Sequence, residues 1–528
     1  MCLVVLPGFT SLLFAQTRPL VDPAVQAEAQ AQEEARALAA ARAWRIEPSI
    51  GSTVTATSNS GLSFGPDPAK DLIVDVEPRV IIHGRGASFT LEGNLGLKQL
   101  VFVNSTQENR VLPTGTIALN ANLVERWLYF DLSALAEQVA ADPYTTRADS
   151  DSSVNKINSF QYRVSPYLQH RFTPDFSLTA RNDNIWTRRR GEFNLNDARR
   201  NSLFNKDSLL LEQLPRPLGF SLEGSQQTTK YLTGVETILK NGSARAIVTY
   251  AVDPTFTVGL VGGKEKSEYA LSTTSDTISG ARVTWVPTER TELKGSYEKR
   301  FFGNGGSLQF SHRSPFIALT LNASREPSAL GTSFLLNPGA GDTRTLLDAI
   351  FTTRYPNPAD RAAIVNGVIA GLGAPSVLGN PLEVFADYAQ LRDSASASVV
   401  FQGVRSTVIT RVFAVRSRQL IDPNAPFVPV LGVQADHTQK GLSVDFNRRL
   451  TRTLSMEVGL GYSSIEGLGI ASGQITKNGT ARLGLSQDMS PKTRATVGAR
   501  YQKASVVAPG QAGTANETAA FVGMVHRF

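Results

Sequence analysis

The feature that most constrains this chain is an alternation of apolar and polar residues with a period of two, which recurs from Trp44 to the last residue. Between residues 454 and 463, Leu, Met, Val, Leu and Tyr alternate with Ser, Glu, Gly, Gly and Ser. Similar alternation is present at 291–298 and 495–502. Because successive side chains of a strand point to opposite faces, this period indicates β-strands with one apolar face. The sequence therefore predicts an all-β protein.

Alternation alone does not separate a soluble sandwich from a membrane barrel. Here the second face consists largely of Gly, Ser, Thr and charged residues, as expected for a water-filled lumen. After residue 20 no apolar run approaches the length of a membrane-spanning helix, and only 19% of residues are charged. Short Pro-containing turns such as Thr173–Asp175 alternate with longer polar segments, the asymmetry of an outer-membrane barrel. These observations favour a transmembrane antiparallel up-and-down β-barrel.

The pattern gives about 22 strands, within a range of roughly 18 to 24. The first is expected near residues 46–57 and the last near 513–528. With this count all short turns fall at one end of the barrel, together with both chain termini, which we expect to be periplasmic. We expect a helical extracellular insertion in the long interruption at 327–386, since Pro358 is typical of a helix start. An apolar stripe at helical spacing predicts that this loop packs inside or over the barrel mouth; it consists of Ile364, Val365, Val368, Ile369 and Leu372.

The domain organisation follows from these boundaries. Residues 1–15 predict a signal peptide with cleavage after Ala15. Its positive first region is missing, so either the peptide is truncated at its start or the segment is not a leader, and we favour the first. Residues 16–43 are rich in Ala, Gln and Glu and predict a loose periplasmic helix, a tether or a disordered segment. Residues 44–528 form the barrel. Cys2 is the only cysteine, so no disulfide framework or thiolate metal site is expected in the mature chain.

The closing strand and the lumen supply the candidate site residues. The last strand ends on an aromatic residue, and we expect Val522, Met524 and Phe528 to direct barrel assembly at the lipid–water interface. Charged residues of the second face are expected to line the lumen: Glu292, Lys294, Asp445, Glu457, Arg482 and Arg500.

A cluster of arginines in a polar segment has two interpretations. It could capture an anionic glycan, or it could bind lipopolysaccharide phosphates at the membrane surface. The residues concerned are Arg188, Arg189, Arg190, Arg199 and Arg200.

Catalytic signatures are weak. The five histidines have no metal-ligand spacing. Gly61–Gly65 matches Gly-x-Ser-x-Gly, but no helix is expected after it, so the context of a nucleophile elbow is missing. The net charge of +7 is compatible with anionic partners and does not require nucleic acid. We expect no enzyme activity, no cofactor and no metal.

Four stretches carry a resemblance to a known family. They are Trp44–Ile50, Glu125–Asp131, Leu346–Phe351 together with Pro358–Val365, and Phe401–Thr407. In these the chain resembles the outer-membrane β-barrel family associated with the PEP-CTERM/exosortase system of Gram-negative bacteria. The resemblance covers nearly all of the chain after residue 43. It implies a role beside exopolysaccharide loci and no catalytic residue.

The sequence therefore favours an integral outer-membrane barrel that acts as a passage or scaffold for an exported exopolysaccharide. Its partners would be outer-membrane lipid and lipopolysaccharide, with the polymer and periplasmic export components as further candidates. A general diffusion porin is the alternative, and an outer-membrane hydrolase is a third that has little support.

Overall fold

The computed structural model describes residues 44–140, 142–146, 155–190, 201–232, 237–269, 272–328, 343–352, 361, 365, 381–382, 389–420, 436–508 and 511–528. The chain divides into two compact units, Met1–Arg45 and Ile46–Phe528. The description below concerns the second unit. Among the residues described, no helix has the length and apolar composition needed to cross a membrane.

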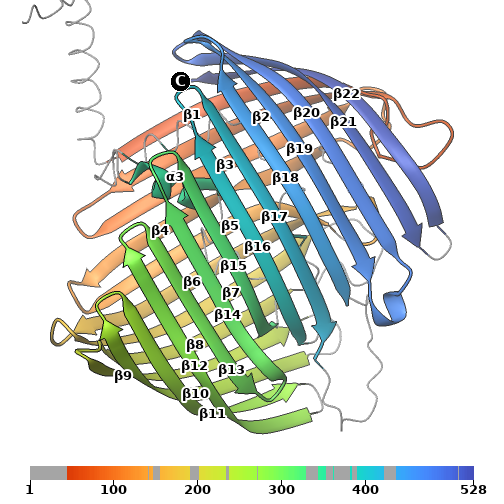
Figure 1. The fold of residues 1–528 in the computed structure, drawn as a ribbon. Coiled ribbons are helices and arrows are strands. Elements are labelled where there is room, and N and C mark those ends of the chain that lie inside the picture. Colours follow the sequence, from red (N-terminus) through yellow and green to blue (C-terminus); the bar gives the residue numbers. More distant parts are fainter. Residues whose placement is uncertain are drawn as a thin grey trace, which may run out of the picture. The chain divides into compact units, whose positions relative to one another are not determined.

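The second unit is a closed antiparallel β-barrel of 22 strands (Figure 1). The first half comprises β1 (Trp44–Thr57), β2 (Asp71–Arg85), β3 (Phe89–Phe102), β4 (Arg110–Val124), β5 (Leu128–Ala140), β6 (Lys156–Arg171), β7 (Phe176–Arg190), β8 (Ser202–Gln213), β9 (Leu218–Tyr231), β10 (Thr237–Asp253) and β11 (Phe256–Tyr269). The second half comprises β12 (Ser272–Thr288), β13 (Thr291–Arg300), β14 (Gly303–Arg313), β15 (Ile317–Ser328), β16 (Gln390–Gln402), β17 (Ser406–Gln419), β18 (His437–Arg449), β19 (Leu454–Gly467), β20 (Ile475–Ser490), β21 (Thr493–Ala508) and β22 (Gln511–Arg527). A helix, α3 (Thr343–Phe351), and a short 3-10 helix, η2 (Gly469–Ala471), complete the described elements.

Each strand pairs with its neighbours in sequence, and β1 pairs with β22 from Ser49–Arg527 to Thr57–Ala519. This last pairing closes the sheet, so no strand edge is left without hydrogen-bond partners. The predicted barrel and its strand number are confirmed.

The two ends of the barrel differ. At the end where β1 begins and β22 stops, every connection between strands is a turn of two to four residues, and we call it the short-turn end. Polar side chains cap these turns: Asp253 accepts from the backbone N–H of Thr255 at 2.7 Å, and Ser314 Oγ accepts from that of Ile317 at 3.1 Å. At the opposite end, the long-loop end, some connections are tight turns such as 301–302, and others are longer in sequence, namely 58–70, 141–155, 191–201, 329–389 and 420–436.

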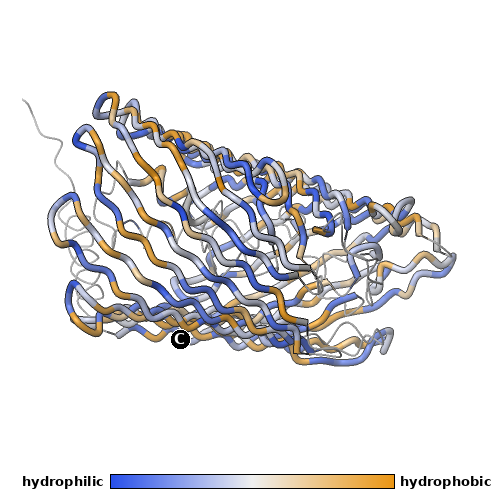
Figure 2. The backbone as a smooth tube through the Cα atoms, turned by 90° about the horizontal axis from the view of Figure 1, so that it is seen from below, coloured by the Kyte–Doolittle hydropathy of each residue, from blue (hydrophilic) through white to orange (hydrophobic). Residues whose placement is uncertain are grey.

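The two faces of the sheet are chemically distinct, and Figure 2 shows the alternation of hydrophilic and hydrophobic residues along the strands. Ion pairs join side chains on strands two or three apart, such as Arg282 on β12 and Glu223 on β9. Only the concave side of a curved sheet brings such side chains together, so this side is the inner face. The opposite, outer face exposes large apolar residues, among them Leu460 at 50% and Val522 at 61%.

The chain end is anchored in the closing strand. The backbone N–H of Phe528 donates to the carbonyl of Pro48 on β1 at 3.0 Å, and its ring packs edge-on against His526 with centroids 5.1 Å apart. Val522, Met524 and Phe528 are exposed on the outer face.

The first prediction follows from these contacts of Phe528. Deleting Phe528, or changing it to Asp, removes the aromatic ring from the end of the strand that closes the barrel, and it should leave the protein periplasmic and sensitive to protease. Heat-modifiable mobility and membrane fractionation measure this. A Phe528→Trp variant is the matched control and should assemble normally. A normal barrel in the outer-membrane fraction after deletion of Phe528 would contradict the prediction.

Candidate functional site

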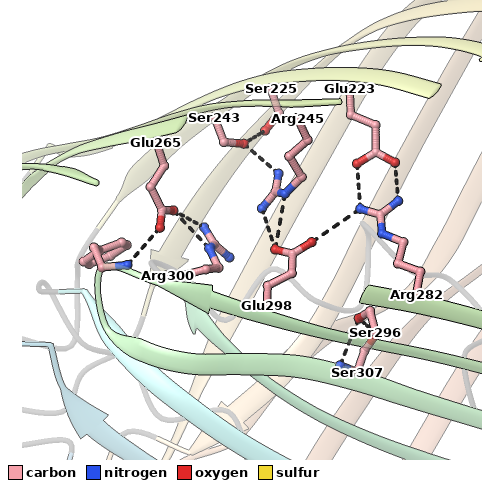
Figure 3. A network of polar contacts seen from close by, with 11 residues as sticks. Glu223, Ser225, Ser243, Arg245, Glu265, Arg282, Ser296, Glu298, Arg300 and Ser307 are labelled. Atoms are coloured by element: carbon pink, nitrogen blue, oxygen red, sulfur yellow. Dashed lines mark hydrogen bonds and ion pairs between the residues drawn. The ribbon is translucent and has the colours of Figure 1, made fainter. Parts of the chain in front are cut away.

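The inner wall of β9–β13 carries a network of paired arginines and glutamates (Figure 3). Arg282 Nη2 donates to Glu223 Oε2 at 2.8 Å and reaches Glu298 at 3.5 Å. Arg245 Nη2 lies 3.2 Å from Glu298 Oε2. Arg300 Nε donates to Glu265 Oε2 at 3.0 Å, next to the end of β13. These residues alternate in sign, so the wall is polar and ordered without presenting a block of one charge.

The same design recurs elsewhere on the inner face. On β5–β7, Arg181 pairs with Asp131, and Arg163 Nη2 lies 2.6 Å from Asp183 Oδ1. Glu517 lies on β22, the strand that closes the barrel against β1, and is 1% exposed. It accepts hydrogen bonds from Thr57 Oγ1 on β1 at 2.7 Å and from Arg500 Nη2 on β21 at 2.9 Å. Because charged hydrogen bonds inside a barrel replace hydration, these pairs hold long side chains against the wall.

Strand alternation places all six residues predicted to line the lumen on the inner face. Glu292 and Lys294 share the face of Glu298 and lie 2.6 Å apart at their charged atoms. Glu457 alternates with the outward Leu460, and Arg482 lies with its guanidinium 5.2 Å from the ring centroid of Phe521. Asp445 and Arg500 alternate with the exposed Leu442 and Tyr501.

A helix from the long segment between β15 and β16 packs against the inner wall. Leu347, Ile350 and Phe351 of α3 form a buried cluster with three wall residues. Those wall residues are cross-strand neighbours on β15, β16 and β17: Ala318, Val400 and Ile409. The cluster lies near the short-turn ends of these strands (Figure 1).

The position of α3 is far from the end of the strand that precedes it in the sequence. β15 ends at Ser328, at the long-loop end, about 33 Å along the strand from Ala318. Leu347 then lies beside Ala318 again. The part of the segment around α3 is thus deep inside the barrel rather than over its long-loop mouth.

Of the predicted apolar stripe, Val365 is 1% exposed in the α3 cluster. Ile364, Val368, Ile369 and Leu372 lie outside the described residues, as does the predicted helix start at Pro358. Arg361 Nε donates to Asp348 on α3 at 2.7 Å.

Contacts also cross the long-loop end between strands far apart in the barrel. Tyr144, after β5, donates its hydroxyl to the carbonyl of Asp436, before β18, at 3.0 Å. Thr476 Oγ1 on β20 donates to the carbonyl of Tyr144 at 2.7 Å. Gln439 on β18 bonds both the N–H and the carbonyl of Leu382 in the long segment, at 2.8 and 2.7 Å. We call this set of four bonds the mouth contacts.

A second apolar cluster lies at the same end. Tyr231 and Leu239, from the β9–β10 hairpin, are buried with Ala389, and the partly buried Leu420 packs against them. Burial also raises the pKa of the Asp142 carboxyl in the β5–β6 connection, although the backbone N–H of Tyr144 donates to it. Described residues of several connections thus contact one another at this end of the barrel.

The arginine cluster differs from the prediction. Arg188, Arg189 and Arg190 are the last residues of β7 rather than part of a loop, because β7 continues to pair with β6 as far as Asn158–Arg190. Strand alternation therefore splits the set: Arg188 and Arg190 are exposed, whereas Arg189 is half-buried on the other face. Arg199 and Arg200 lie outside the described residues.

The sequence contains two weak catalytic signals, scattered histidines and a Gly-x-Ser-x-Gly match. In the described ranges, no group of three or more His, Cys, Asp or Glu side chains could hold a metal ion. Ser63, in the Gly-x-Ser-x-Gly match, is held by Asn59, whose Oδ1 accepts from the Ser63 backbone N–H at 2.9 Å.

Sequence reasoning missed α3 and the mouth contacts. The apolar residues of α3 recur at helical spacing in Leu346–Phe351, which could have indicated an amphipathic helix. The mouth contacts join residues 292, 332 and 57 positions apart, and no local sequence pattern predicts them.

Comparison with protein-family models and with curated proteins finds no match. Among solved structures, the barrel is similar to the siderophore receptor PirA from Acinetobacter baumannii, at 9% identity and a TM-score of 0.46, over 92% of this chain and 80% of that one. The FrpB iron transporter from Neisseria meningitidis is 9% identical with a TM-score of 0.48, over 91% and 82%. The ferric-catecholate import receptor Fiu from E. coli is 8% identical with a TM-score of 0.44, over 91% and 81%. The barrel architecture itself rests on the strand pairing described above.

Proposed function

We propose that this protein is an integral outer-membrane barrel that forms a gated passage for an exported exopolysaccharide, with both chain termini in the periplasm. The gating is inferred from α3, a helix of the long β15–β16 segment that packs against the inner wall near the short-turn end. An outer face of exposed apolar residues suits lipid, and a closed sheet satisfies its backbone hydrogen bonds there. The polymer as cargo is supported by the resemblance to the PEP-CTERM/exosortase-associated barrels.

The inner wall suits a hydrated polar cargo. Its described charges are mostly paired with opposite charges, so a neutral or weakly charged glycan would meet hydrogen-bonding groups without strong trapping by one sign of charge. Passage through a pore requires binding that is weak enough to allow exit. The exposed Arg188 and Arg190 would face lipopolysaccharide phosphates at the membrane surface, and periplasmic export components would meet the short-turn end.

The general diffusion porin is the rival function. A barrel of about 22 strands encloses a wide lumen, and natural barrels of this size contain a plug. The helix inside the lumen and the mouth contacts favour a path that is closed at rest over free diffusion.

A chromosomal deletion separates the two functions. Loss of the gene should strongly reduce surface exopolysaccharide while leaving the uptake of small antibiotics unchanged, and the wild-type gene should restore the polymer. Surface polymer is measured by lectin or dye binding and uptake by minimum inhibitory concentration. Unchanged polymer together with reduced small-solute uptake would instead establish a porin. A Leu347→Met complement, which keeps the helix packed, is the matched control and should restore export fully.

A further inference from the structure

The outer face of most strands follows one rule. Counted from the short-turn end, at most one polar outward residue comes first, a run of apolar outward residues follows, and polar ones resume only beyond that run. On β19 the apolar run consists of Leu454, Met456, Val458, Leu460 and Tyr462. On β21 the outward line begins at Thr493 and runs through Ala495, Val497, Ala499 and Tyr501 before Lys503. This apolar zone is the surface that lipid would cover.

Strands β7 and β8 break this rule. The outward residues of β7 run Phe176, Leu178, Ala180, then Asn182 and Asn184, then Trp186. Those of β8 run Leu211, Leu209, then Asp207 and Asn205, then Leu203. Polar residues thus occupy the middle of the apolar zone, between leucines on one side and the exposed, cross-strand pair Trp186–Tyr162 on the other.

The four polar side chains form one hydrogen-bonded set, which we call the polar ladder. Asn182 Nδ2 donates to Asp207 Oδ1 at 2.6 Å, and Asn205 Nδ2 donates to Asn184 Oδ1 at 2.9 Å. Asn184 donates to Asn182 and joins the two pairs. Each amide retains hydrogen-bonding capacity beyond these bonds.

A groove lies beside the ladder, toward the short-turn end. It has a volume of about 560 Å³, and Ala180, Leu209, Gly224, Pro166 and Leu168 contribute to its lining together with Asn182 and Asp207. The groove is deep at Gly224 because this residue has no side chain to fill it. A Cβ built there would contact only Leu209 Cβ, at 3.9 Å. The exposed Leu209 and Leu222 stand at its edge.

Lipid hydrocarbon cannot form hydrogen bonds with the polar side chains of the ladder. Lipid tails offer no hydrogen bonds to amides, and a carboxylate in contact with them is strongly disfavoured. Polar side chains within membrane proteins usually meet polar groups of neighbouring segments. The ladder and groove therefore indicate a protein surface as the covering partner.

We propose that this partner is a second copy of the chain, related by a two-fold axis parallel to the barrel axis. The pairing of β7 with β8 sets Asn182 level with Asp207 and Asn184 level with Asn205. A two-fold axis between the strands brings Asn182 opposite the partner's Asp207 and Asn184 opposite the partner's Asn205. Every amide then meets a complementary acceptor or donor, and the projecting leucines of each copy meet the groove of the other.

The inference rests on the membrane location in the proposed function and is independent of its cargo. The test uses the full chain with Cys2→Ser, so that an introduced cysteine is unique. Asn205→Cys, treated with a short bis-maleimide in intact outer membranes, should give a crosslinked dimer in high yield. Leu460→Cys, outward on β19, is the matched control and should remain monomeric.

A second variant tests the ladder itself. Asn182→Leu with Asp207→Leu makes the apolar zone continuous, so the barrel should keep its heat-modifiable fold while its mass in nanodiscs falls from dimer to monomer. A monomeric wild-type protein, a double variant that stays dimeric, equal crosslinking at both cysteines, or adducts only with lipid or another protein would overturn the proposal. Absence of the wild-type protein from the outer-membrane fraction would refute the proposed function as well, whereas a monomer within that fraction refutes only the dimer.

Discussion

Removal of residues 340–380 is expected to raise the single-channel conductance of the reconstituted barrel several times and to increase antibiotic uptake in cells. The deletion removes α3, and with it the apolar contacts to Ala318, Val400 and Ile409 on the inner wall. It leaves 11 residues after Ser328 and 9 before Gln390, and these two residues are cross-strand partners, so the connection can still close. Planar-bilayer recording and minimum inhibitory concentrations measure the effect.

Point variants distinguish the obstruction of the lumen by α3 from a general effect of shortening the chain. Leu347 is fully buried in the α3 cluster, so Leu347→Asp should release the helix from the wall and raise conductance without any change of length. Leu347→Met nearly conserves volume and should conduct like the wild type. If the full-length barrel already conducts as widely as the deletion, the segment does not obstruct the lumen and the gating proposal fails.

The second large effect concerns the two faces of β19. Val458 faces outward between Phe446 and Leu483, while Glu457 faces the lumen between Asn447 and Gly484. Arginine on the lipid face of a barrel costs about 2–4 kcal/mol at the bilayer midplane, whereas a lumen position keeps its charge hydrated. Val458→Arg should therefore lower the free energy of unfolding by about this amount, and Glu457→Arg by much less.

Urea titration of folding into lipid vesicles measures both variants. Glu457→Gln serves as the control for loss of the carboxylate alone and should be the mildest of the three. Equal destabilisation by Val458→Arg and Glu457→Arg would mean that β19 does not expose Val458 to lipid.

Local pattern determined the strands. A period of two, such as that of Leu454–Ser463, fixes both the extended backbone and the face of each side chain, because a strand has no other way to separate apolar from polar residues. Turn residues such as Asp253 and Ser314 were readable for the same reason, since their side chains bond backbone groups only two or three residues away. The strand number and the short-turn end followed from these signals.

Interactions across the barrel were decided by tertiary structure. Arg282 meets Glu223 only because the sheet curves, and Tyr144 meets Asp436 only because their loops cross one end of the closed barrel. The helix α3 has a recognisable local pattern, but its place beside Ala318 depends on where a long connection returns, which chain closure decides. The polar ladder shows the same limit. The sequence Arg181–Trp186 reads as one strand, and only the pairing of β7 with β8 reveals that four polar side chains gather on the outer face of the sheet.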